Sequence, residues 1–162
     1  TSEDDVNSIA EWSLDSGELR RIFEGHVRKI NALFATKKRL LSGSQDGTAK
    51  EWSLETGQCT RTFNNHSTDF KASLLVHDGI MYNCSKTSDI NAWSLGTGEL
   101  IRTFAGHSDQ VFGLTMVGEN MYSSSADCAI KEWSLTTGEC LRTFEGHTDY
   151  ISKLVVQWVD DD

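Results

Sequence analysis

Four histidines recur at matched positions in this sequence, and imidazole is the side chain that most often binds metals or transfers protons near neutral pH. His26, His66, His107 and His147 follow one another at intervals of 40, 41 and 40 residues. Taken alone, such a set suggests a metal site or an acid–base cluster. The regular spacing argues against both, because equivalent positions of a repeat lie in different structural units. We therefore expect these histidines to have structural roles.

The four cysteines give no stronger indication of chemistry. Cys59, Cys84, Cys128 and Cys140 contain no C-x-x-C pair, whereas metal ligands normally come in closely spaced pairs. Cys59 and Cys140 share one repeat position, so we expect them in different units and not bridged. Free thiols predict a reducing, cytoplasmic (intracellular) location. No apolar segment approaches the ~20 residues that span a bilayer, so no membrane association is expected.

Composition and motifs also argue against catalysis and nucleic-acid binding. The formal net charge is −9, whereas nucleic-acid binding depends on cations that neutralise phosphates. We interpret the acidity as a contribution to solubility. The sequence contains no G-x-S-x-G elbow, no H-E-x-x-H pair and no phosphate-binding glycine loop. It therefore predicts a protein without enzymatic activity, cofactor or resident metal.

The elements that position the histidines belong to a repeat of about 40 residues. A tryptophan stands 14 residues before each histidine, at Trp12, Trp52, Trp93 and Trp133. Residues 128–147 match residues 47–66 at 12 of 20 positions without a gap. A fixed period of this size indicates a repeat architecture, which has to be considered before any single residue is given a role.

Each repeat has the pattern of short β-strands. In the second repeat, the segments 30–34, 39–44, 48–54 and 58–63 predict strands, separated by turns at 37–38, 45–47 and 56–57. No segment shows a sustained helical period. The sequence therefore predicts an all-β protein of four-stranded antiparallel sheets. One such small sheet is not stable alone, so the sheets must stack face to face.

These repeats resemble the WD-repeat family of β-propellers. Gly-His pairs stand at 25–26, 106–107 and 146–147, Trp-Ser-Leu recurs at 12–14, 52–54, 93–95 and 133–135, and related turns stand at 44–47 and 125–127. The resemblance covers essentially the whole chain and implies a single propeller domain over residues 1–162. All four repeats have Trp-Ser where the family usually has Trp-Asp.

The resemblance implies a buried hydrogen-bond network of His, turn Asp, strand Ser or Thr, and Trp in each blade. The implied network residues are His26, Asp46, Trp52, His66, Trp93, His107, Asp127, Trp133, His147 and Trp12, with Ser42 or Ser44 and Ser123 or Ser125 as the strand serines. Thr87 replaces the turn aspartate and Asn65 replaces the glycine before His66, so the blade of residues 67–104 should be the least regular.

Two further residue sets repeat. The phenylalanines Phe23, Phe63, Phe104 and Phe144 are predicted to form the core between blades. The arginines Arg21, Arg61, Arg102 and Arg142 are expected to shield the outer edge of each blade.

The resemblance also implies a non-catalytic scaffold that presents one propeller face to a peptide or partner domain. The partner-binding positions carried over are Lys29, Gln45, Asp69 (or Phe70), Lys86, Gln110, Ala126 and Tyr150. Alternatives are a propeller that binds a small ligand, such as a sugar, on each blade, or a fragment of a larger WD-repeat regulatory protein.

The phase of the repeat predicts how the chain closes. Thr1 and Asp162 both correspond to Tyr122, in the middle of a second strand. The N-terminal segment would supply the last two strands of a blade and residues 150–156 the first. Two copies exchanging these parts would form a homodimeric eight-bladed ring without free sheet edges. A longer propeller chain and a monomeric four-bladed ring are the alternatives.

Overall fold

A computed structural model describes residues 7–64, 73–84 and 88–156. The chain divides into two compact units, Thr1–Leu74 and Leu75–Asp162. The residues that the structure describes contain strands and no α-helix, so none of their segments is a helix able to cross a membrane. The predicted all-β class is confirmed.

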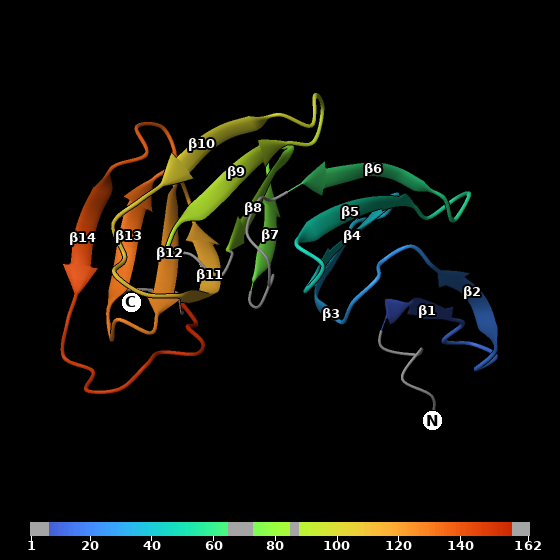
Figure 1. Ribbon diagram of the computed structural model, residues 1–162, viewed down its shortest axis with the longest axis horizontal. Helices are drawn as coiled ribbons and strands as arrows, with labels where there is room; N and C mark the ends of the chain where they lie inside the picture. The colour runs from blue at the N-terminus through green and yellow to red at the C-terminus, as the bar shows by residue number, and fades with distance from the viewer. Residues whose placement is uncertain (1–6, 65–72, 85–87, 157–162) are drawn as a thin grey trace, which may run out of the picture. The chain divides into compact units, whose positions relative to one another are not determined.

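The first unit contains a two-stranded and a four-stranded antiparallel sheet (Figure 1). Its strands are β1 (Ile9–Trp12), β2 (Leu19–Phe23), β3 (Ile30–Ala35), β4 (Arg39–Ser44), β5 (Thr48–Ser53) and β6 (Cys59–Asn64). β3 to β6 form a meander in chain order, and their bounds lie within one residue of the predicted strands. β1 and β2 are the pair expected at the N-terminus as the last two strands of a blade.

The second unit contains two four-stranded meanders (Figure 1). Its strands are β7 (Leu74–His77), β8 (Ile80–Cys84), β9 (Ile90–Ser94), β10 (Leu100–Phe104), β11 (Val111–Val117), β12 (Asn120–Ser125), β13 (Ile130–Ser134) and β14 (Cys140–Phe144). Each sheet repeats the order of the β3–β6 sheet. The four-stranded antiparallel blade predicted from the sequence is therefore confirmed.

The segment 150–156 differs from its predicted strand. It forms no strand, and among the described residues a backbone hydrogen bond joins Ile151 N to Ser125 O at 3.0 Å. A strand needs a partner for each of its backbone groups. The single bond holds only the start of the segment, so the remainder follows no ladder.

Neighbouring sheets of one unit pack through aromatic side chains. The Phe23 ring of β2 meets the Trp52 ring of β5 edge-on, with centroids 5.9 Å apart. In the second unit, Phe104 meets Trp133 in the same way at 6.0 Å. These side chains are about 1% exposed, which confirms that the repeated phenylalanines form core between sheets. Phe144 departs from the pattern, because it is 38% exposed.

The repeated arginines Arg21 and Arg102 each join neighbouring sheets. Arg21 Nη1 donates to the Leu54 carbonyl at 2.7 Å and Nη2 to the Glu55 carbonyl at 3.2 Å, in the turn between β5 and β6. Arg102 Nη1 donates to the Leu135 and Thr136 carbonyls at 3.1 and 3.0 Å. We call this contact the arginine clamp. It differs from the expected role of shielding the outer edge.

The turn that receives the clamp has to end in glycine. A Cβ atom added to Gly57 would lie 2.8 Å from Arg21 Cδ, and one added to Gly138 would lie 2.7 Å from Arg102 Cδ. Both glycines also have positive φ angles, +78° and +82°, which a side chain disfavours. The Thr-Gly element of the repeat is therefore a seat for the arginine as well as a turn.

The aromatic contacts between sheets predict a large difference between two positions on β10. Phe104→Ala should lower the free energy of unfolding by about 3–5 kcal/mol, because it opens a cavity against Trp133. Ile101→Ala is the control, because Ile101 is 52% exposed on the same strand and should change stability by less than about 1 kcal/mol. Urea unfolding followed by tryptophan fluorescence measures both. Equal losses would contradict the packing described here.

Candidate functional site

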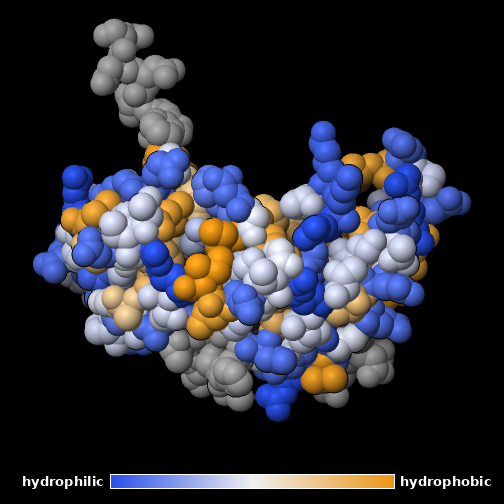
Figure 2. Space-filling view, turned by 90° about the horizontal axis from the view of Figure 1, so that it is seen from above, coloured by the Kyte–Doolittle hydropathy of each residue, from blue (hydrophilic) through white to orange (hydrophobic). Residues whose placement is uncertain are grey.

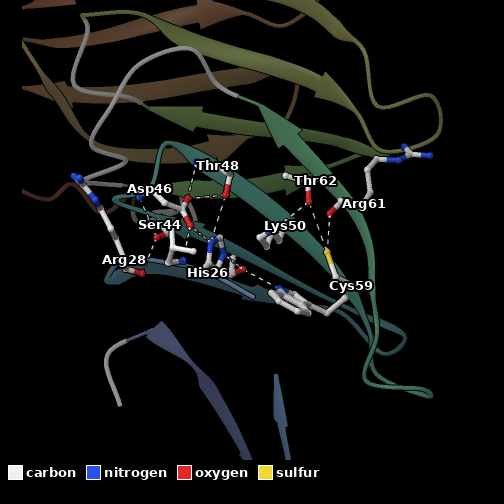
Figure 3. Close-up of polar contacts among 12 residues, drawn as sticks. His26, Arg28, Ser44, Asp46, Thr48, Lys50, Cys59, Arg61 and Thr62 are labelled. Atoms are coloured by element: carbon white, nitrogen blue, oxygen red, sulfur yellow. Dashed lines mark hydrogen bonds and ion pairs between the residues drawn. The ribbon is translucent and has the colours of Figure 1, made fainter. Parts of the chain in front are cut away.

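A chain of hydrogen bonds runs through the β3–β6 sheet (Figure 3). His26, in the segment before β3, contacts Asp46 Oδ2 through Nδ1 at 2.8 Å and Ser42 Oγ through Nε2 at 2.8 Å. Trp52 Nε1 donates to the same Ser42 Oγ at 2.8 Å. The turn Asp46, two strands and the preceding segment are thereby joined. Ser42 is the serine that completes the network, while Ser44 Oγ instead donates to the Arg28 carbonyl at 2.9 Å.

The same chain of bonds recurs in the β11–β14 sheet. His107 Nδ1 lies 2.7 Å from Asp127 Oδ2, and His107 Nε2 lies 2.7 Å from Ser123 Oγ. Trp133 Nε1 donates to Ser123 Oγ at 2.7 Å. The Ser125 hydroxyl bonds a backbone carbonyl, that of Asp109, at 3.0 Å. The two networks agree atom for atom.

A neutral imidazole satisfies every polar atom of this chain. The indole N–H donates to the serine oxygen, the serine hydroxyl donates to His Nε2, and His Nδ1–H donates to the carboxylate. If the imidazole were charged, Nε2–H and the indole N–H would both donate to one serine oxygen. The buried serine proton would then lose its acceptor, which costs free energy.

Burial and hydrogen bonding set the charge states. Burial lowers the pKa of His26 and of His107, although the hydrogen bond to the neighbouring aspartate acts in the opposite direction. Burial alone would raise the pKa of Asp46, but hydrogen bonds from Thr48, His26 and Val27 outweigh it and hold that pKa at about 2. The Asp127 pKa is likewise lowered, by hydrogen bonds from His107, Ser108 and Ala129 that overcome burial. Each network is therefore a neutral histidine beside an ionised aspartate.

The glycine before each network histidine allows the tryptophan to approach. A Cβ atom on Gly25 would lie 3.3 Å from Trp52 Cη2, and one on Gly106 would lie 3.1 Å from Trp133 Cη2. Both glycines have positive φ, +144° and +155°. The Gly-His pair of the sequence thus places the backbone on the indole ring and the imidazole beside it.

The remaining predicted network residues that the structure describes are Trp93, Trp12 and His147. Trp93 Nε1 donates to Asn83 Oδ1 at 2.9 Å, so an asparagine replaces the serine, while His66 and Thr87 lie outside the described residues. Trp12 is 57% exposed and His147 is exposed. Across residues 7–64, 73–84 and 88–156, neither takes part in a network of the kind seen at Trp52.

Ser, His and Asp in this order and at these distances also form the triad of serine hydrolases. Here the geometry cannot perform that chemistry. Ser42 and Ser123 have no exposed surface, so no substrate carbonyl can reach their oxygens. Each oxygen also accepts the indole N–H. The arrangement therefore stabilises the sheet. Within the described part of the chain, no three His, Cys, Asp or Glu side chains are grouped to hold a metal ion.

The predicted partner-binding residues are brought together in pairs at the histidine end of the sheets. Gln45 N donates to the Lys29 carbonyl at 2.9 Å, and Ala126 N donates to the Gln110 carbonyl at 2.8 Å. Tyr150 is exposed and immediately precedes Ile151, which is bonded to Ser125. The other two predicted positions, Asp69 and Lys86, lie outside the described residues.

The sequence prediction missed one member of this surface. The Phe112 ring lies 6.0 Å from the Tyr150 ring, between centroids, and is half-buried beside it. The first repeat with a complete sheet has Asn31 at the position of Phe112. An aromatic residue where another repeat is polar is the signal that could have indicated Phe112. Gln110, Phe112, Ala126 and Tyr150 are named the aromatic turn surface.

Repeated meander sheets, two of which hold a His–Asp–Ser–Trp network, define the chain as a repeat protein built from propeller blades. A profile of the family "WD domain, G-beta repeat" matches residues 17–53 and 98–134. The chain belongs to the WD40 repeat family. A search of curated protein sequences found no match.

Solved structures of the same fold include two designed proteins. The computationally designed Ika8 protein is 30% identical, with a TM-score of 0.85 over 94% of this chain and 48% of its own. The computationally designed Ika4 protein is 32% identical, with a TM-score of 0.77 over 83% of this chain and 84% of its own. The RRP9 WD40 repeats are 24% identical, with a TM-score of 0.77 over 82% of this chain and 43% of theirs. The chain thus spans about half the length of Ika8 and of the RRP9 structure.

The central serine predicts opposite effects at two neighbouring positions on β12. Ser123→Ala should lower the free energy of unfolding by about 2–4 kcal/mol, because it leaves the Trp133 N–H and His107 Nε2 buried without partners. Ser124→Ala is the matched control. Ser124 is equally buried, and its hydroxyl has no hydrogen-bond partner among the described residues. Its loss should therefore be neutral or slightly stabilising in urea unfolding. A similar loss for both variants would show that the serine bonds contribute little.

The two buried histidines predict a stability that falls with acid. Because their pKa values are lowered in the folded state, the unfolded chain takes up protons first as the pH falls below about 6.5. The free energy of unfolding should therefore decrease from pH 7 to pH 5. A further decrease should follow below about pH 4, where the aspartates of the unfolded chain become protonated.

The measurement is the urea midpoint at intervals of pH. His107→Gln should reduce the dependence between pH 7 and 5, because it removes one buried imidazole. A midpoint that stays constant over that range in the unmodified protein would contradict the neutral, buried state of the histidines.

Proposed function

We propose that the chain is a non-catalytic protein-interaction platform and that the aromatic turn surface is the part that contacts a partner. The observation that carries this proposal is the aromatic pair of half-buried Phe112 and exposed Tyr150 at the histidine end of the second unit. Tyrosine buries a large area at low entropic cost and is enriched among residues that dominate binding energy. The adjacent Gln110 and Ala126 add an amide and a small apolar contact.

A protein partner fits the variation between repeats. Lys29 and Gln45 stand in one sheet where Gln110 and Ala126 stand in another. A ligand bound once per blade would require like residues at equivalent positions, whereas a partner covering several turns does not. WD40 repeat domains are generally protein-interaction scaffolds, which supports the same choice. An intracellular location is part of the proposal and is supported by the four free cysteines.

We also propose that two copies of the chain associate into a closed ring. Trp12 is 57% exposed and Phe144 is 38% exposed, whereas Trp52, Trp133, Phe23 and Phe104 are about 1% exposed. The end sheets thus expose surfaces that the same residue types bury elsewhere in the molecule. Association that covers both surfaces would remove apolar area from water, which is the main driving force of stable association.

The test of partner binding uses variants of the aromatic turn surface. Captured proteins are identified with the unmodified chain, and the affinity of a purified candidate is then measured by calorimetry. Tyr150→Ala should weaken binding by about 2 kcal/mol or more if this tyrosine dominates the contact.

Glu119→Ala is the control, because Glu119 lies in an exposed turn at the opposite end of the same sheet, where the Leu135 N–H bonds its carbonyl. Equal affinities for the Tyr150 variant, the control and the unmodified chain would move the partner site away from this surface.

A further inference from the structure

The arginine clamp has two parts, which the structure shows together at Arg21 and at Arg102. The first part is an arginine on the outermost strand of one sheet, two residues before a phenylalanine. The second part is the Leu-x-Thr-Gly or Leu-x-Ser-Gly turn of the next sheet. Arg21 with the turn at Leu54 is one such pair, and Arg102 with the turn at Leu135 is another. In both pairs the arginine also lies over its own phenylalanine, with Cζ 5.8 and 6.0 Å from the ring centroids of Phe23 and Phe104.

In the described part of the chain, the arginine at the corresponding place on β14 bonds no turn of this kind. Arg142 lies over Phe144, with Cζ 5.6 Å from the ring centroid, and its Nε lies 3.7 Å from Glu132 Oε2. Its side chain is 68% exposed, compared with 30% for Arg21. Within the residues that the structure describes, no hydrogen bond from its Nη atoms to a backbone carbonyl is found. Arg142 and Phe144 therefore form a clamp arginine and its stacking ring without an acceptor.

Among the described residues, no arginine bonds the Leu14 and Asp15 carbonyls of the turn between β1 and β2, and the nearby Arg20 Nη2 donates instead to the Ser13 hydroxyl at 3.3 Å. The backbone hydrogen bonds of this turn match those of the occupied turn: Gly17 N donates to Ser13 O at 2.9 Å, and Gly57 N donates to Ser53 O at 2.8 Å. Leu14 is fully exposed. A Cβ atom on Gly17 would meet nothing within 4 Å, whereas one on Gly57 would overlap Arg21. The seat is therefore formed and empty.

We propose that Arg142 of one copy binds the Leu14–Gly17 turn of a second copy, where it forms the same clamp as Arg21 and Arg102. This rests on the self-association proposed above and names the contact that holds it. The guanidinium would donate to the Leu14 and Asp15 carbonyls, and the Asp15 carboxylate adds opposite charge beside it. Phe144 would be covered by the half-sheet of β1 and β2.

A second copy is the partner that would contact both Arg142 with Phe144 and the Leu14–Gly17 turn. A two-fold arrangement places the Arg142 of each copy on the turn of the other, so the contact occurs twice and the assembly closes. Figure 2 shows apolar side chains at the surface in separate patches. Leu14 and Phe144 are both exposed and would be removed from water by this contact. The similarity to Ika8 supports an assembly of two copies, because this chain matches about half of the Ika8 chain.

The first experiment measures self-association by sedimentation velocity over a range of protein concentrations. Arg142→Ala should weaken dimerisation at least tenfold, because a charge-assisted bidentate contact is lost at each of two junctions. Arg142→Lys keeps the charge but not the two-pronged geometry and should also weaken it. Arg28→Ala removes an equal charge from an exposed position in another segment and is the charge control.

A glycine pair gives a control for backbone strain. Gly17→Ala should weaken dimerisation, because the new methyl group would occupy the seat of the arginine. Gly79→Ala is the matched control, since Gly79 has a φ of +73° against +70° for Gly17 and a Cβ there would also meet nothing within 4 Å. Both variants should lose the same stability as monomers in urea unfolding, and the dimerisation constant should change in one alone.

The second experiment identifies which copy supplies the arginine. Benzoylphenylalanine in place of Leu14 is photo-crosslinked in an equal mixture of copies with natural and heavy nitrogen. Crosslinks to residues 140–144 should join light and heavy peptides. Crosslinks within one isotope alone would show that the chain's own arginine fills the seat, and would overturn the proposal.

The outcomes separate this inference from the function on which it rests. A chain that stays monomeric at every concentration would end both the proposed dimer and its clamp. A dimer whose stability is unchanged in the Arg142 and Gly17 variants would leave self-association standing and overturn the clamp. Partner binding through Tyr150 is measured separately, so neither result decides that proposal.

Discussion

The serine hydroxyl at the centre of each network is the contact on which the sheet depends. Ser42 Oγ accepts the Trp52 indole N–H and donates its proton to His26 Nε2. One hydroxyl thus joins β4, β5 and the segment before β3. The histidine then holds Asp46, and Asp46 accepts backbone N–H groups of the turn and of the incoming segment, Thr48 N at 2.9 Å and Val27 N at 3.1 Å. Buried polar groups are costly unless all are paired. The pairing here fixes one register and one turn geometry.

Two contacts join neighbouring sheets, and each recurs at fixed positions of the repeat. A phenylalanine ring and an indole ring meet edge-on, and an arginine on the outer strand bonds the neighbouring turn. Both contacts use residues at fixed places in the repeat, so each sheet recognises the next one by local rules. Stability in such proteins is close to a sum of repeat terms and neighbour terms. The exposed residues of the end sheets could therefore add contacts with a further sheet that the isolated chain does not make.

The sequence sufficed for what repeats and was weaker for what differs. The strand bounds followed from alternation and turn residues, and the network followed from the resemblance, because His26, Ser42, Asp46 and Trp52 are found together. The choice of Ser42 over Ser44 needed coordinates, since both are buried serines on one strand. The arginine clamp was missed because a tight turn is by itself a sufficient reason for the glycine of the Thr-Gly pair. Phe112 was missed because its partner, Tyr150, is 38 residues away in sequence.

The direction of the arginine clamp has a consequence for how such chains can change in length. Each repeat has its clamp arginine near its end and the turn whose carbonyls accept an arginine near its middle. Any whole repeat can therefore precede or follow any other. Duplication or deletion of a whole repeat keeps each donor facing an acceptor. A change by part of a repeat separates them and leaves an orphan at the junction. The number of repeats in such a chain can therefore change, but only by whole repeats.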